Sequence, residues 1–151
     1  MDFIKRVRSR YALAGTGDHW TCFAFSGIPP SDLHCTHKYI GPLTEQAADQ
    51  LAGILDGWFA VNPMVPFPVR FDQVDHFGPD RTIRVLRPSV EVPELSHGWA
   101  AGFLPGLRRR LDPFRADDYG YKPHVTSDEQ VVDRMVTRYC WCRGDDIVRE
   151  W

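Results

Sequence analysis

Short strand-like stretches on either side of one regular helical stretch constrain the fold of this chain most. Between Thr44 and Phe59 the apolar residues recur at helical spacing, and Thr44 is a suitable N-cap with Glu45 in the first turn. Ahead of this helix, residues 21–28 and 33–41 are rich in β-branched and aromatic side chains, which favours two strands. The chain is therefore expected to mix helices with strands.

The middle of the chain continues this mixed pattern. Residues 67–77 and 81–88 are joined by a Gly-Pro-Asp turn and predict a hairpin of two strands. A second helix is expected to begin near Pro93 and to reach Leu111. Three residues must kink or interrupt it: Gly102, Pro105 and Gly106.

Further strands are expected towards the C-terminus. Residues 121–127 read as a strand with Pro123 near its beginning, and residues 136–151 as a hairpin that turns at 143–146. The order of strands, helix, hairpin, helix and strands predicts an α+β fold with helices packed against antiparallel sheets.

Length and charge narrow the range of functions. The 151 residues fit a single domain, 1–151, and the formal net charge of -2 does not favour binding to a long nucleic acid. No apolar run reaches the length of a membrane span, and the charged first ten residues do not resemble a secretory signal. We therefore expect a cytoplasmic protein that binds a small anionic ligand, if any, in a local pocket.

The cysteines do not indicate a disulfide framework or a strong metal site. Cys22, Cys35, Cys140 and Cys142 are expected to be free thiols, since no export signal accompanies them. Cys140 and Cys142 form a lone Cys-x-Cys, which is a weak zinc signature even with His34 and His37 in the same chain. No metal or other cofactor is expected.

Two His-x-Thr stretches carry the chemistry of this sequence: His34 with Thr36, and His124 with Thr126. Residues two apart on a strand project from the same face, with Cα atoms about 6.5 to 7 Å apart. Two such strands side by side would therefore place two imidazoles and two hydroxyl groups around one point. A single His-x-Thr would more often be structural, so the prediction depends on the pair.

This arrangement suits the cleavage of a phosphodiester. An imidazole pKa of about 6.5 lets one histidine take a proton from the attacking oxygen while the other gives a proton to the leaving oxygen. The threonine hydroxyls can donate hydrogen bonds to the non-bridging oxygens as charge develops there. No metal is required for these steps.

The residues around the motifs resemble a known family. The stretch HCTHKYIG, residues 34–41, resembles the first signature of the two-histidine (2H) phosphoesterase superfamily, and YKPHVTS, residues 121–127, resembles the second. The resemblance implies a two-lobed α+β fold with both motifs in a central cleft. It also implies that His34 and His124 are the acid and base, and that Thr36 and Thr126 hold the phosphate. The stretch SDE at 127–129 departs from the apolar continuation that is usual in the family.

A narrower resemblance concerns the phage anti-CBASS phosphodiesterases, 2H proteins that cleave cyclic di- and trinucleotides. Tyr11 before a glycine-rich segment, and Glu150 and Trp151 at the C-terminus, are similar in position and type. An aromatic side chain that stacks on a base contributes about 1 to 3 kcal/mol without demanding sequence. The resemblance implies that these three residues bind substrate.

Two lysines are further candidates for phosphate contacts. Regular alternation places Lys38 on the face of His34 and Thr36, and Cys35, His37 and Tyr39 on the opposite face. Lys122 lies two residues before His124. A solvated lysine is an equally good interpretation of either.

Three hypotheses follow. The leading one is a metal-independent phosphodiesterase that hydrolyses cyclic di- or trinucleotides, in the host cytoplasm if the protein is phage-encoded. The second is an RNA 2',3'-cyclic phosphodiesterase or RNA ligase-like protein, and the third is a sponge that binds a cyclic nucleotide without cleaving it. The sequence leaves open which histidine is the base, and whether a 2'-hydroxyl or water attacks.

Overall fold

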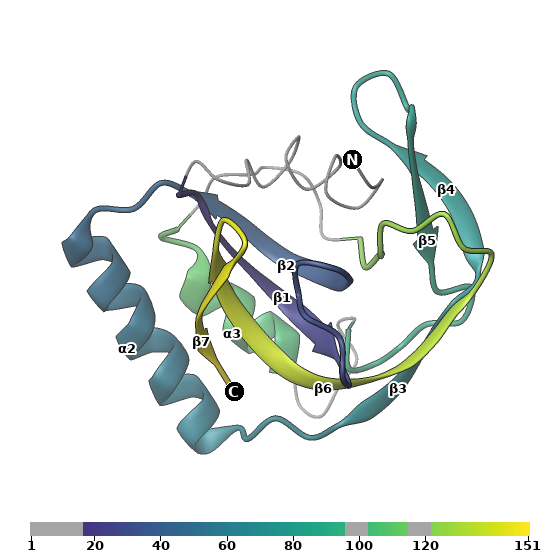
Figure 1. Cartoon of the computed structure of the whole chain (residues 1–151). Coiled ribbons are helices and arrows are strands. Elements are labelled where there is room, and N and C mark those ends of the chain that lie inside the picture. Colours follow the sequence, from purple (N-terminus) through teal and green to yellow (C-terminus); the bar gives the residue numbers. More distant parts are fainter. Residues whose placement is uncertain (1–16, 96–102, 115–121) are drawn as a thin grey trace.

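The computed structural model describes residues 17–95, 103–114 and 122–151, drawn in colour in Figure 1. Within these ranges the chain forms strands and helices in a mixed order. In chain order they are β1 His19–Phe25, β2 His34–Gly41, α2 Glu45–Val61, β3 Phe67–Phe71, β4 Gln73–Phe77, β5 Ile83–Arg87, α3 Phe103–Leu111, β6 Val132–Arg143 and β7 Asp146–Glu150. The expectation of an α+β fold is confirmed.

The strands form one large and one small antiparallel sheet. The large sheet has the order β2-β1-β6-β3, with β7 also paired to β6, while β4 and β5 form a separate two-stranded sheet. Strand β6 is 12 residues long, so its first part pairs with β3 and its last part pairs with β7. The central β1 pairs with both β2 and β6.

The two helices in the described part of the chain, α2 and α3, lie on one side of the large sheet (Figure 1). Helix α2 turns Leu51, Leu55 and Phe59 towards the sheet at a spacing of four residues, and all three are buried in the main hydrophobic core. The Thr44 hydroxyl caps this helix by accepting a hydrogen bond from the Ala47 amide at 3.1 Å, as the sequence predicts. The main core therefore occupies the helix side of the sheet.

Helix α3 packs closely against α2 at Gly106. A Cβ atom at Gly106 would lie 2.6 Å from Cη2 of Trp58, so the absence of a side chain allows this contact. The Arg110 guanidinium lies above the Trp58 ring, 5.6 Å from its centroid. Pro105 lies within α3, in the part of the helix that the structure describes.

The predicted strand 67–77 is divided in the structure. Its first part, β3, joins the large sheet through β6, and only its second part, β4, forms the hairpin with β5. Asp72 lies at the division, where its carboxylate accepts hydrogen bonds from the amide and hydroxyl of Ser89. These contacts fix the corner at which the chain leaves one sheet for the other.

Two further expectations concern the C-terminal hairpin and the second helix. The C-terminal hairpin is confirmed, with Gly144 at a φ of 58° in its turn. The described part of the second helix begins at Phe103, and residues 96–102 lie outside the described ranges. In the described parts of the chain, no helix combines the length and the apolar character needed to cross a membrane.

Candidate active site

The two His-x-Thr stretches meet through one residue, Val125. It pairs antiparallel with Cys35 of β2 on one side and with Leu86 of β5 on the other, so its segment lies between these strands (Figure 1). Val125 and Leu86 exchange two backbone hydrogen bonds, of 2.9 and 3.0 Å. The predicted strand 121–127 is thus a short bridge, and it joins the small sheet to the large one.

This pairing places both motifs on one face. Cys35, Val125 and Leu86 are completely buried in the main core. Side chains alternate along extended chain, so the residues on either side of Val125 and Cys35 project away from that core. The antiparallel register sets His34 opposite Thr126 and Thr36 opposite His124.

The two histidines therefore lie on a diagonal. In a regular antiparallel pair such diagonal positions are about 7 to 8 Å apart, with the Cβ atoms somewhat closer. The two threonines occupy the other diagonal. All four side chains are partly exposed, so a small ligand can approach the space between them.

His34 is held from two sides. Its Nδ1 lies 2.6 Å from the carbonyl oxygen of Pro30, in the loop between β1 and β2. Its ring packs against the buried Trp20 ring, with 4.4 Å between the centroids. Trp20 itself is anchored by a hydrogen bond from its indole nitrogen to the Gly144 carbonyl.

His124 is held in a similar way. Its Nδ1 lies 2.8 Å from the carbonyl oxygen of Lys122, and its ring packs edge-on against Phe77, with 4.6 Å between the centroids. Desolvation lowers the pKa of His124 below its ordinary value of 6.5; the Arg87 charge adds to this, whereas the Lys122 carbonyl and Asp75 oppose it. The neutral imidazole is therefore the favoured form near neutral pH.

The rings of His34 and His124 have the same tautomer. A carbonyl oxygen can only accept a hydrogen bond, so Nδ1 of each histidine carries a hydrogen. Nε2 is then the nitrogen whose protonation changes. Each imidazole thus has its Nδ1 fixed by a backbone carbonyl, which leaves proton transfer to Nε2.

Two residues that the sequence did not single out, Arg87 and Asp75, lie beside His124. The pairing of Leu86 with Val125 sets Arg87 directly opposite His124. Nη1 of Arg87 donates to Asp75 Oδ2 at 3.2 Å, and both charges affect the pKa of His124. The available signal was the alternation of β5, in which Arg87 follows Ile83 and Val85 on one face.

The structure corrects the expected position of Lys38. Register shifts between β1 and β2 interrupt the alternation, so Thr36 pairs with Cys22 but Lys38 pairs with the buried Thr21. Tyr39 then packs with Trp20, on the face where alternation would have placed Lys38. The register does not place Lys38 beside Thr36.

Glu150 is on the face that carries the motifs but far from them. Thr36 pairs with Cys22, Cys22 with Cys140, and Cys140 with Glu150, which makes one row across four strands. Three steps of about 4.8 Å put Glu150 about 14 Å from Thr36. Its carboxylate is 3.3 Å from Nη1 of Arg138.

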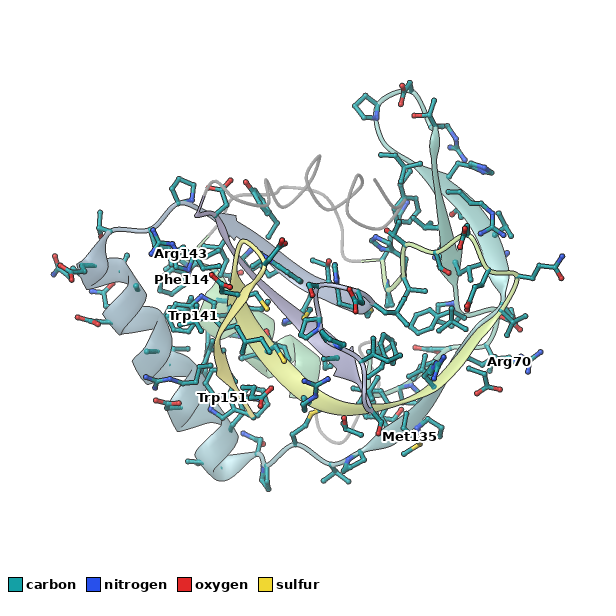
Figure 2. All side chains as sticks on the ribbon, viewed as in Figure 1. Arg70, Phe114, Met135, Trp141, Arg143 and Trp151 are labelled. Carbon is teal, nitrogen blue, oxygen red and sulfur yellow. The ribbon has the colours of Figure 1, made fainter. Side chains whose placement is uncertain are left out.

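Trp151 lies on the opposite face of the sheet. Its ring stacks on Phe59 of α2 at 5.2 Å between centroids, and its indole nitrogen donates to Asp56 at 3.1 Å. Figure 2 shows Trp151 beside α2. It packs against the helix, so the structure does not bring it together with the two histidines.

Two candidate residues remain to be placed. Lys122 is exposed, and it is its backbone carbonyl that holds His124. Tyr11 lies outside the described residues.

The four cysteines are buried in the structure. Cys22, Cys140 and Cys142 pack with Trp20 on the face of the sheet that carries the motifs, and none of the four cysteines is in a disulfide. Across residues 17–95, 103–114 and 122–151, no three His, Cys, Asp or Glu side chains are grouped to hold a metal ion.

An open hollow of about 460 Å³ lies between α2 and α3, on the helix side of the sheet. Gly53 and Gly57 of α2 and Arg110 of α3 are among its lining residues. None of the His-x-Thr residues lines it. We therefore assign the site by the pairing of the motifs and by their hydrogen bonds.

Comparison with solved structures identifies the fold. E. coli LigT in complex with NADP+ matches with a TM-score of 0.62 at 11% identity, over 89% of this chain and 96% of LigT. A crystal structure of a phosphoesterase matches with a TM-score of 0.59 at 11% identity, over 90% of this chain and 98% of that one. A protein of Thermus thermophilus matches with a TM-score of 0.55 at 15% identity, over 89% of this chain and 96% of that one.

LigT has also been crystallised with 3'-AMP and with ATP. No protein-family profile matches this sequence, and no curated protein matches it. The similarity is therefore one of fold: the chain has the α+β fold of LigT along nearly its whole length.

Proposed function

We propose that this protein is a 2H phosphoesterase that cleaves phosphodiester bonds in small nucleotides without a metal ion. The observation that carries the proposal is the antiparallel pairing of Cys35 with Val125. It gathers the two histidines and two threonines on one face, with each imidazole held through Nδ1. The LigT fold adds support, since LigT has been crystallised with small nucleotides.

His124 serves as the base and His34 as the acid in this proposal. The lowered pKa of His124 keeps its Nε2 without a proton near neutral pH, so this nitrogen can accept one from the attacking hydroxyl group or water. The oxygen attacks phosphorus, and the bond to the leaving oxygen breaks. His34, protonated at Nε2, gives its proton to that oxygen.

The threonines stabilise the charge that develops during attack. Thr36 and Thr126 flank the histidines on the other diagonal, from which their hydroxyls can donate to the non-bridging oxygens. Two proton carriers and two neutral donors provide for both proton transfers and part of the charge stabilisation. This division of roles does not depend on a Lewis acid.

The favoured substrate is a cyclic di- or trinucleotide. The formal charge of -2 gives no general attraction for long RNA, which supports a small substrate. Phe77, a half-buried ring against His124, is an aromatic surface near the site. The resemblance to anti-CBASS enzymes supports the cyclic substrate, although Trp151 no longer contributes to that argument.

A substrate panel tests the proposal. Purified protein is incubated in excess chelator with cyclic di- and trinucleotides and with RNA that ends in a 2',3'-cyclic phosphate, and the products are separated by chromatography. Opening of a cyclic nucleotide supports the leading proposal, and exclusive turnover of the RNA end identifies an RNA-processing enzyme instead. Loss of free ligand without product would identify a sponge and contradict catalysis.

A further inference from the structure

Arg87 has a position and a buried hydrogen-bond donor, Nε, that the proposed mechanism does not explain. It is the residue directly opposite His124 across the pairing of β5 with Val125. Directly opposite residues on one face have Cβ atoms about 4.5 to 5.5 Å apart. The guanidinium therefore originates next to one of the two imidazoles.

Part of the guanidinium is fixed within the protein. Nη1 donates to Asp75 Oδ2 at 3.2 Å, and Asp75 Oδ1 accepts from the His76 amide at 2.8 Å. The His76 amide and Arg87 both lower the pKa of Asp75, so this carboxylate stays ionised. Asp75 is therefore a stable anchor for Arg87.

Another part of the guanidinium has no such partner. Nε of Arg87 is buried and has no hydrogen-bond partner in the structure of the described ranges. Leaving a buried charged donor unsatisfied is costly, and an unsatisfied group of this kind in a native protein calls for an explanation. Nε and Nη2 form an edge with two parallel N–H groups, which matches two oxygens of a phosphate.

We propose that Arg87, held by Asp75, binds the substrate phosphate through its Nε and Nη2 edge. This inference rests on the proposed function and names the cation of the same site. Bound there, the guanidinium balances the negative charge of the phosphate beside His124. It completes a set in which imidazoles move protons, hydroxyls donate hydrogen bonds and one fixed positive charge holds the anion.

Arg81 provides a matched control. It also contacts Asp75, with 3.7 Å between Nη2 and Oδ1, but it lies in the exposed turn between β4 and β5. Replacing Arg81 by glutamine removes a positive charge and an ion pair with the same carboxylate. This substitution leaves the Nε and Nη2 edge of Arg87 in place next to His124.

The experiment measures the binding of adenosine 3'-monophosphate by calorimetry and the turnover of whichever diester the wild type cleaves. In Arg87→Gln we expect about 10- to 100-fold weaker binding and a similar loss in kcat/KM, the scale of a charged hydrogen bond. Arg87→Lys should recover part of the loss, because an ammonium keeps the charge without the planar edge. Arg81→Gln should match the wild type.

A role in folding alone would give a different pattern. In the wild type the positive charge of Arg87 lowers the pKa of His124, so an NMR titration of the ligand-free Arg87→Gln variant should show a higher pKa for His124. The thermal unfolding midpoint of this variant should stay near the wild-type value. Wild-type affinity and kcat/KM in Arg87→Gln would overturn the inference and leave the proposed function standing. A wild type that binds the nucleotide but cleaves nothing would contradict the proposed function, and the affinities would still decide the role of Arg87.

Discussion

Cys35 and Val125 form an antiparallel pair on the core side of the sheet, and both side chains are completely buried. Because each is the middle residue of a His-x-Thr, their pairing turns all four polar side chains to the opposite face. The same pairing therefore buries two side chains in the core and places the four polar side chains of the site on the opposite face. The buried pair fixes the distance between the histidines, so its packing is part of the catalytic geometry.

The first prediction concerns pH. Burial lowers the pKa of His124 below 6.5, so the base form persists at more acidic pH than for a free histidine. The acidic limb of kcat/KM should therefore have its midpoint below 6.5, measured at constant ionic strength and compared with an NMR titration of His124. If kcat/KM instead falls as the pH rises through the pKa of His124, then His124 is the acid.

The threonines should affect kcat more than KM. Thr36→Val and Thr126→Val keep the shape but remove a donor, so each should lower kcat about 100-fold, the scale for one oxyanion donor. Serine at either position should restore most of the rate. Thr82→Val, in the exposed turn where its hydroxyl bonds to Asp80, is the control and should match the wild type. Wild-type rates in both valine variants would remove the threonines from the mechanism.

Trp151 should contribute to stability and little to catalysis. Trp151→Ala removes the stack on Phe59 and the hydrogen bond to Asp56, and should lower the free energy of unfolding by about 1 to 3 kcal/mol. Turnover at a temperature where the variant is folded should be unchanged. Denaturant unfolding and kcat/KM together check this, and a large rise in KM with normal stability would return Trp151 to the binding site.

The contact between the helices gives a prediction about folding. Gly106→Ala places a Cβ atom 2.6 Å from Trp58, so it should destabilise the protein by about 1 to 3 kcal/mol. Gly53→Ala is the matched control, since its Cβ atom meets nothing within 4 Å and α2 gains helix propensity of about 0.5 to 1 kcal/mol. Urea unfolding of both variants measures the difference. Changes of the same sign would contradict the packing described here.

The sequence was sufficient for local features. The helix cap at Thr44, the C-terminal hairpin and the two His-x-Thr stretches are each encoded in a few neighbouring residues. The division of residues 67–77 was not predictable in this way, because β3 takes its partner β6 from the far end of the chain. A periodic pattern defines a strand but does not name its partner.

The positions of several site residues also depend on partners that the pattern of a single strand does not reveal. Lys38 was misplaced because a register shift between paired strands leaves no mark in the alternation of one strand. The packing of Trp151 was not predictable because its partner, Phe59, belongs to a distant helix. Arg87 was missed because its relation to His124 depends on a bridge formed by one residue.

Replacement of the histidines tests the central claim most directly. The initial rate of cleavage of the best diester, in excess chelator, is compared for the wild type, His34→Ala, His124→Ala and His76→Ala. His76 is exposed on β4, where alternation turns it away from Phe77 and the site. The account predicts that each of the first two variants loses about 100- to 10,000-fold in rate while His76→Ala keeps the wild-type rate. Unchanged turnover in His34→Ala or His124→Ala would contradict it.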